Sequence, residues 1–213
     1  MKTRKTMHKP VILMDFGGVY FTGAIKPVTK RFSRKFGIPQ QRIHDALAGA
    51  NWKTYAEGRC NDRQYWKNVS DTLELSREQT QELRTAYYDY PKPQKGMIKF
   101  VRKLKGKYRI AVISSHVPGW IALLEKKYRM SREFHELHYS YNHGIDKPHE
   151  IERLGAKFFM STAKKMKVNP KDCIVIDDKK KILDPIKRTG ARTILFKNAK
   201  QLEADLKKMG VEI

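Results

Sequence analysis

Four short apolar runs stand out along the chain, and each leads into polar residues or a loop. They are VILMD at 11–15, RIAVIS at 109–114, CIVID at 173–177 and RTILF at 192–196. Continuous apolar runs of this length are typical of strands that are buried on both faces of a parallel sheet. Because helix-compatible segments at 96–107, 157–168 and 182–191 precede the second, third and fourth runs, the pattern predicts an α/β fold.

Residues 22–92 interrupt this alternation. They contain helix-like stretches at 28–36, 40–47, 62–73 and 77–90, and the segment ends in the turn-forming sequence YPKPQKG. The simplest interpretation is a helical insertion after the first strand. We therefore expect a core formed by 1–21 and 93–213 and a helical cap formed by 22–92. Four aromatic residues of the insertion are expected to pack inside it rather than stack on bases: Trp52, Tyr55, Tyr65 and Trp66.

The composition favours a globular cytoplasmic protein. The chain has 213 residues, 40% of them hydrophobic, and no uninterrupted apolar run is long enough to span a membrane. The basic N-terminus lacks the apolar core of an export signal. Cys60 and Cys173 are far apart, so neither a disulfide framework nor a zinc cluster is indicated. We expect a reducing compartment and no membrane partner; the oligomeric state is not predicted.

The charge is unusual, because 45 Lys and Arg face 22 Asp and Glu, which gives a formal net charge of +23. Such a charge favours encounter with phosphorylated or polyanionic molecules. The basic residues are spread along the whole chain without one aromatic-rich basic tract. Two interpretations remain open: a solvated basic surface, or a binding surface for nucleic acid or another polyanion.

Polar residues with reactive side chains stand at the ends of three apolar runs. Asp15 leads into Gly17 and Gly18, which let a ligand approach the backbone closely, and the pair Asp177 and Asp178 ends the third run. Carboxyl ends of parallel strands meet at one edge of a sheet, where ligands bind. Two carboxylates with retained waters and a substrate phosphate are the ligands that Mg²⁺ prefers. We therefore predict a magnesium site; solvated loop aspartates are the alternative.

Two further segments add donors to this edge. Ser114 ends the second run and is followed by Ser115 and His116, whereas Lys147 lies in the loop-like sequence GIDKPHE. A hydroxyl at Ser114 is able to donate to a phosphoryl oxygen, but a helix N-cap explains the same serine equally well. Lys147 alone carries little information among 45 basic residues.

Taken in order, these sites resemble the four motifs of the haloacid dehalogenase (HAD) superfamily, in its phosphatase-like branch with a helical C1-type cap. Motif one is DFGGV, which begins at Asp15, and motif two is Ser114 in VISS. Motif three is Lys147 in GIDKP, and motif four is VIDD, which ends at Asp178. The cap segment WKTYAEGRCNDRQYW at 52–66 also resembles that branch. The resemblance implies a three-layer Rossmann-like parallel sheet core with an inserted helical-bundle cap.

The resemblance also implies catalytic and metal-binding roles. Asp15 is expected to attack phosphorus and form an aspartyl-phosphate, while Lys147 and Ser114 hold the phosphoryl oxygens. Magnesium is expected to be held by Asp15, the carbonyl of Gly17 and Asp178, with Asp177 as a supporting residue or a further ligand.

The substrate-binding residues implied by the same motifs are Gly18, Ser115 and His116. The cap is expected to exclude water and to contact the substrate.

The chain departs from the family pattern at three positions. Many HAD phosphatases have an acid/base Asp two residues after the nucleophile, and Gly17 stands here instead, as in other DxGG sequences. His116 or a water held by the substrate are the candidate replacements for this acid. Ser115 and Ile182 replace polar residues that often support the metal site. Dehalogenation is disfavoured, because it gains nothing from a magnesium site.

These observations favour a magnesium-dependent phosphomonoesterase that acts on a small phosphorylated metabolite, with sugar phosphates ahead of nucleotides. The alternative is a catalytically weak HAD-like protein that binds nucleic acid or another polyanion through its basic surface. A phosphatase that acts on polynucleotide ends combines both hypotheses.

Overall fold

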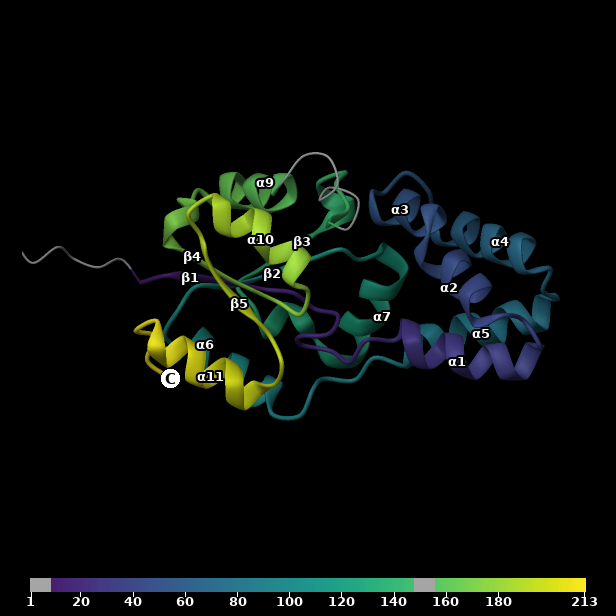
Figure 1. Cartoon of the computed structure of the whole chain (residues 1–213), viewed down its shortest axis with the longest axis horizontal. Helices are drawn as coiled ribbons and strands as arrows, with labels where there is room; N and C mark the ends of the chain where they lie inside the picture. Colours follow the sequence, from purple (N-terminus) through teal and green to yellow (C-terminus); the bar gives the residue numbers. More distant parts are fainter. Residues whose placement is uncertain (1–8, 148–155) are drawn as a thin grey trace, which may run out of the picture.

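The computed structural model describes residues 9–147 and 156–213. Within these ranges five parallel strands form one sheet in the order β3-β2-β1-β4-β5 (Figure 1). The strands are β1 (Val11–Met14), β2 (Ile110–Ser114), β3 (Glu136–Tyr139), β4 (Cys173–Asp177) and β5 (Arg192–Leu195). The predicted parallel sheet and α/β class are therefore confirmed, and β1 and β4 lie next to each other at its centre.

Alternate residues of the strands bury opposite faces of the sheet. Ile12 and Met14 of β1 join one hydrophobic cluster with α6 (Met97–Lys105), α7 (Pro118–Tyr128) and α11 (Ala199–Lys208). Val11 and Leu13 join a second cluster with α9 (Lys157–Met166) and α10 (Lys180–Arg188). Helices therefore cover both faces, and Figure 1 shows α9 and α10 on one side of the strands with α6 and α11 on the other. The predicted three-layer core is confirmed.

Strand β3 was not predicted from the sequence. Its sequence is ELHY, it lies at the edge of the sheet beside β2, and three of its four residues are only partly buried. Polar Glu136 and His138 interrupt the apolar pattern, and Glu136 forms an ion pair with Arg109. An edge strand that is incompletely covered does not need the continuous apolar run by which the other four strands were identified.

The segment after β1 forms a group of helices beside the core (Figure 1). These helices are α1 (Ile25–Phe36), α2 (Gln40–Ala48), α3 (Ala50–Ala56), α4 (Asp62–Leu73) and α5 (Arg77–Asp89). The four predicted helical stretches are thus confirmed, and α3 is added to them. Capping boxes fix the starts of α4 and α5, through Asn61 with Gln64 and Ser76 with Gln79.

Two linkers connect these helices to the core, and they run side by side. Phe21 pairs with Pro93 in an antiparallel bridge. The Thr22 amide donates to the Lys92 carbonyl at 2.9 Å, and the Gln94 amide donates to the Tyr20 carbonyl at 2.8 Å. The chain therefore leaves and re-enters the sheet layers at the same place. The domain boundaries at 21/22 and 92/93 remain a prediction.

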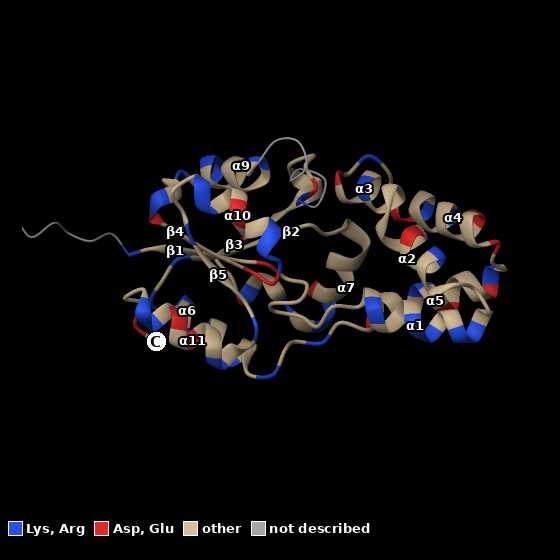
Figure 2. Cartoon of the chain, in the orientation of Figure 1, with Lys and Arg blue, Asp and Glu red and all other residues tan. Residues whose placement is uncertain are grey.

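Basic residues are distributed over both parts of the molecule. Figure 2 shows Lys and Arg on α1 and α5 in the helical group and on α6, α9 and α10 around the sheet. This distribution follows their spread along the sequence, and the nucleic-acid alternative remains a prediction. In the described ranges no helix combines the length and the apolar character that a membrane crossing needs.

Candidate active site

The predicted site residues gather at the carboxyl edge of the sheet. Asp15 follows β1, Ser114 ends β2 and Asp177 ends β4, so the parallel strands bring them together. All nine predicted residues line one pocket with a volume of about 250 Å³: Asp15, Gly17, Gly18, Ser114, Ser115, His116, Lys147, Asp177 and Asp178. The structure thus brings the nine residues together in one pocket, and their roles remain predictions.

Lys147 links two of the aspartates inside this pocket. Its ammonium group donates to Asp15 Oδ1 at 3.0 Å, to Asp177 Oδ2 at 2.8 Å and to the Ile113 carbonyl at 3.1 Å. The three acceptors use all three N–H groups of the ammonium. The side chains of Lys147 and Asp15 are 8% and 9% exposed. The lysine is therefore held rigidly against Asp15.

The charges of this cluster favour an ionised Asp15. Burial alone raises the pKa of Asp15, but the charges of Lys147 and Lys179 and the Ser114 hydroxyl lower it below its ordinary value. Burial raises the pKa of Asp177 to about 6, although Lys147 opposes the change. Burial lowers the pKa of Lys147, but the two aspartates more than offset this and hold it above its usual range. At neutral pH the lysine is charged and Asp15 is a carboxylate.

The third aspartate is arranged differently. Asp15, Asp177 and Asp178 each offer one oxygen within 4.8 Å of the others. Both oxygens of Asp177 already accept hydrogen bonds, from Lys147 and from the Lys179 amide at 2.9 Å. In contrast, the buried Oδ1 of Asp178 has no hydrogen-bond partner within the described chain. A divalent cation would satisfy this oxygen, so the donor set fits a metal held by Asp15 and Asp178, with Asp177 orienting Lys147.

The two glycines after Asp15 have different surroundings. Gly18 has φ of +86°, and a Cβ built on it would lie 2.3 Å from Asp178 Oδ2. Gly18 is therefore needed both for its backbone conformation and for the close approach of Asp178. A Cβ on Gly17 would meet nothing within 4 Å. The position where many HAD phosphatases have an acid/base Asp thus has room for a Cβ.

Hydrogen bonds fix the loop that follows β2. The Ser115 hydroxyl accepts from the Lys147 amide at 2.9 Å, and so it holds the loop that carries the lysine. Ser140 accepts from the His116 amide at 3.1 Å and donates to the His116 carbonyl at 3.2 Å. Ser140 is fully buried just after β3, so the missed strand contributes to the site by anchoring His116.

His116 is held as a neutral ring. Burial lowers the pKa of His116 to about 4, in spite of the nearby charge of Asp15. Its Nδ1 accepts from the Val117 amide at 3.1 Å, so the proton of the neutral ring lies on Nε2. A second proton at Nδ1 would face the amide hydrogen of Val117. His116 can therefore donate a hydrogen bond to a ligand, but it is poorly placed to replace the missing acid/base Asp.

The pocket also contains residues that the sequence analysis did not assign to it. Trp52, which was expected to pack in the helical insertion, is only partly buried and lines the pocket. Tyr87, Trp120 and Lys179 line it as well. Lys179 directly follows the aspartate pair, and this adjacency is a signal that the sequence carried. Trp52, Tyr87 and Trp120 come from three separate helices, and no sequence pattern links them.

The arrangement of the core corresponds to one class of fold. A parallel sheet with order β3-β2-β1-β4-β5, a helical insertion directly after β1 and aspartates at the ends of β1 and β4 are together the HAD-like architecture that the motifs indicated. No protein-family model and no curated protein sequence matches the chain.

Solved structures support this fold. A HAD family enzyme of Bacteroides thetaiotaomicron in complex with magnesium and inorganic phosphate is 19% identical, with a TM-score of 0.74 over 90% of this chain and 96% of that one. A predicted HAD-like family hydrolase of Porphyromonas gingivalis is 17% identical, with a TM-score of 0.73 over 96% and 98%. L-2-haloacid dehalogenase of Xanthobacter autotrophicus is 13% identical, with a TM-score of 0.63 over 97% and 85%. The chain therefore has the HAD fold along most of its length.

Proposed function

We propose that the protein is a magnesium-dependent phosphomonoesterase of the HAD type, with Asp15 as the nucleophile. The observation that carries the proposal is the contact between Asp15 and Lys147 at 3.0 Å, at the bottom of a pocket and at the carboxyl edge of the sheet. It keeps a buried carboxylate ionised, and this is what nucleophilic attack on phosphorus requires. The HAD family structure that contains magnesium and phosphate supports the same assignment.

In the proposed reaction one Asp15 oxygen attacks phosphorus, and the bond between phosphorus and the ester oxygen breaks. The positive charge of Lys147 and the hydroxyl of Ser114 stabilise the negative charge of the phosphoryl oxygens. A water molecule then attacks the phosphorus of the aspartyl-phosphate, which releases inorganic phosphate and restores the Asp15 carboxylate. Magnesium bound by Asp15 and Asp178 would neutralise charge on the phosphoryl group. Asp177 keeps Lys147 in place throughout.

The proposed chemistry gives little help to the leaving group. Gly17 has no side chain, and His116 holds its single proton on Nε2 with Nδ1 engaged by Val117. The departing oxygen must therefore take its proton from water. General acid catalysis usually contributes about 10²- to 10⁴-fold, so esters of acidic alcohols are expected to react faster than esters of ordinary alcohols.

Phosphate release from p-nitrophenyl phosphate, with magnesium or with EDTA, tests the proposal. We expect release by the wild type only with magnesium, and none by Asp15→Asn. Asp184→Asn is the matched control, because Asp184 is exposed on α10 away from the pocket. Release that persists in Asp15→Asn, or a folded wild type that releases no phosphate, would contradict the proposal.

A further inference from the structure

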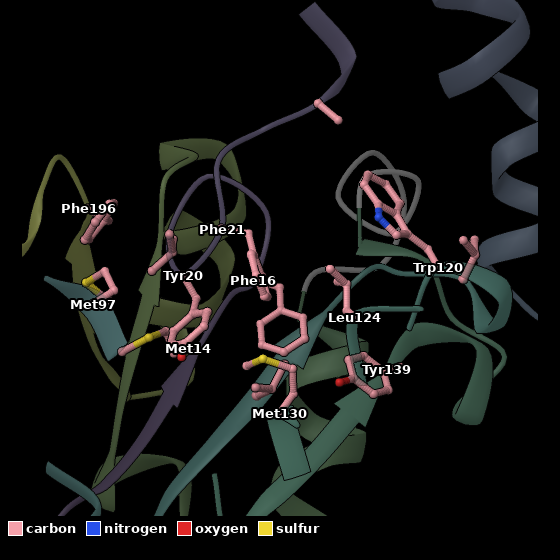
Figure 3. Packing of buried hydrophobic residues seen from close by; sticks show 14 of the residues in the cluster. Met14, Phe16, Tyr20, Phe21, Met97, Trp120, Leu124, Met130, Tyr139 and Phe196 are labelled. Atoms are coloured by element: carbon pink, nitrogen blue, oxygen red, sulfur yellow. The ribbon is translucent and has the colours of Figure 1, made fainter. Parts of the chain in front are cut away.

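The part of the pocket that does not surround Asp15 has an apolar lining. We call this part the apolar wall; it consists of Phe21, Ala24, Ile25, Trp52, Tyr87, Pro91, Trp120 and Leu124. Its members come from the turn after β1 and from α1, α3, α5 and α7, together with the linker that follows α5. Phe21, Leu124 and Trp120 belong to the same buried cluster, in which Phe16 lies beside Phe21 (Figure 3).

The aromatic rings of the wall are held in place by contacts with one another. Trp120 lies 4.8 Å from Tyr87 and 4.7 Å from His116, measured between ring centroids. Trp52 meets Trp120 edge to face at 6.3 Å. Because His116 belongs to the loop after β2, these contacts connect the wall directly to the residues around Asp15. The wall is therefore a preformed surface rather than a set of independent side chains.

The wall offers few hydrogen bonds to a ligand. Three side chains of the wall carry a polar atom, and one of them is already engaged, because the Trp120 indole N–H donates to the Tyr88 carbonyl at 3.1 Å. The other two are the Trp52 indole N–H and the Tyr87 hydroxyl. Among the described residues that line the pocket, the charged side chains are those of Asp15, Lys147, Asp177, Asp178 and Lys179, and the lining includes no Asn, Gln, Arg or Glu. The several hydroxyl groups of a sugar would thus outnumber the partners that the lining offers, and each hydroxyl that loses water without a new partner is costly.

We infer that the pocket selects phosphate monoesters whose alcohol part is a small apolar ring. This inference rests on the phosphatase function proposed above. The volume of about 250 Å³ suits a phosphate with a small ring system. This inference reverses the order expected from the sequence, in which sugar phosphates came first.

Two esters with the same skeleton test the inference. Cyclohexylmethyl phosphate and glucose 6-phosphate both carry a six-membered ring on a CH₂–O–phosphate group, so their leaving groups are similar and their rings differ mainly in hydroxyl groups. We expect kcat/KM to be at least about tenfold higher for the cyclohexylmethyl ester, the effect of one or two unpaired hydroxyl groups. An equal kcat/KM, or a preference for glucose 6-phosphate, would overturn the inference.

Variants of the wall make the test specific. Trp52→Ala should lower the ratio of the two kcat/KM values several-fold, because it removes apolar contact with the ring. Leu123→Ala is the control: Leu123 precedes Leu124 on α7 but is 44% exposed and lies outside the pocket. We expect Leu123→Ala to have the same ratio of the two kcat/KM values as the wild type. A ratio that Trp52→Ala leaves unchanged would contradict a role for the wall.

Binding measurements separate this inference from the proposed function. The phosphonate analogues of the two esters, which are not hydrolysed, are titrated calorimetrically into the wild type with magnesium. Absence of phosphate release from every ester would reject the phosphatase function alone. Tighter binding of the cyclohexylmethyl phosphonate would still support the apolar preference, and equal or weaker binding would overturn it.

Discussion

Asp178 lies so close to Gly18 that a Cβ on this glycine would stand 2.3 Å from Asp178 Oδ2. Gly18→Ala should therefore displace the carboxylate and strain the backbone, whose φ of +86° suits glycine. We expect a loss of about 1–3 kcal/mol in the free energy of unfolding, measured with urea, and weaker magnesium binding by calorimetry.

Gly17→Ala is the matched control for this change. A Cβ at Gly17 meets nothing within 4 Å, so the free energy of unfolding should stay within about 1 kcal/mol of the wild type. Equal destabilisation by the two substitutions would contradict the account of the Gly18 and Asp178 contact.

The space beside Gly17 also allows a gain in activity. Gly17→Asp places a carboxyl group where many HAD phosphatases have their acid/base residue, and a Cβ at this position meets nothing within 4 Å. We expect kcat for alkyl phosphates to rise by up to about 10²-fold, with a smaller rise for p-nitrophenyl phosphate, whose leaving group needs no proton. Gly17→Asn has the same shape without the acid. A rise of equal size in Gly17→Asn would show that proton transfer is not the cause.

The ammonium group of Lys147 balances the charge of two buried carboxylates, so its removal should destabilise the folded protein. Lys147→Met leaves Asp15 and Asp177 without their ammonium partner, and the expected loss in the free energy of unfolding is about 3–5 kcal/mol at pH 8 in EDTA.

The loss in the free energy of unfolding caused by Lys147→Met should be smaller at lower pH. Without the ammonium, burial raises the pKa of both carboxyl groups in the folded state, so protonation stabilises that state as the pH falls. Urea unfolding at pH 5 and pH 8 measures the difference. Lys187→Met, at an exposed position on α10, should show neither effect. A pH-independent loss in Lys147→Met would contradict the charge argument.

The buried His116 should make the free energy of unfolding depend on pH in a second way. Its pKa is lowered to about 4 in the folded protein, whereas an unfolded histidine titrates near 6.5. The stability that the neutral ring contributes is complete above about pH 6.5 and is lost as the pH falls toward 4. The expected loss is about 3 kcal/mol at most.

His116→Asn isolates this contribution, because the amide oxygen can accept from the Val117 amide but does not titrate in this range. Between pH 7 and pH 4 the free energy of unfolding of the wild type should fall by about 3 kcal/mol more than that of the variant. Parallel curves for the two proteins would show that His116 titrates normally.

The strands of this fold differ in how clearly their sequences mark them. Strands β1, β2 and β4 are buried along their whole length and leave continuous apolar runs, so they were predictable. The two edge strands are only partly buried: β5 still has an apolar sequence and was predicted, whereas polar residues interrupt β3 and it was not. Asp15 and Asp178 were found because a carboxylate after an apolar run is uncommon. Lys147 had no local signal and was assigned only through the order of the motifs.

The substrate end of the pocket could not be predicted in the same way. Trp52 and Trp120 are 68 positions apart in the chain, and only the packing of α3 against the loop after β2 brings their rings together. Aromatic residues in an amphipathic helix look alike whether they fill a core or line a cavity. The hydrogen bond that fixes the His116 tautomer likewise depends on the backbone path, which the residue types do not specify.

The paired linkers at Tyr20–Thr22 and Lys92–Gln94 have a consequence for how such a protein can diversify. Since Thr22 and Lys92 are hydrogen-bonded at 2.9 Å, the intervening helices are attached to the sheet through two adjacent points. Another helical segment could be spliced between these points without disturbing the strands that carry Asp15, Ser114 and Asp177. Five members of the apolar wall would be exchanged with that segment, whereas Phe21, Trp120 and Leu124 would stay with the residues around Asp15. The choice of substrate could thus change in part while the reaction is kept.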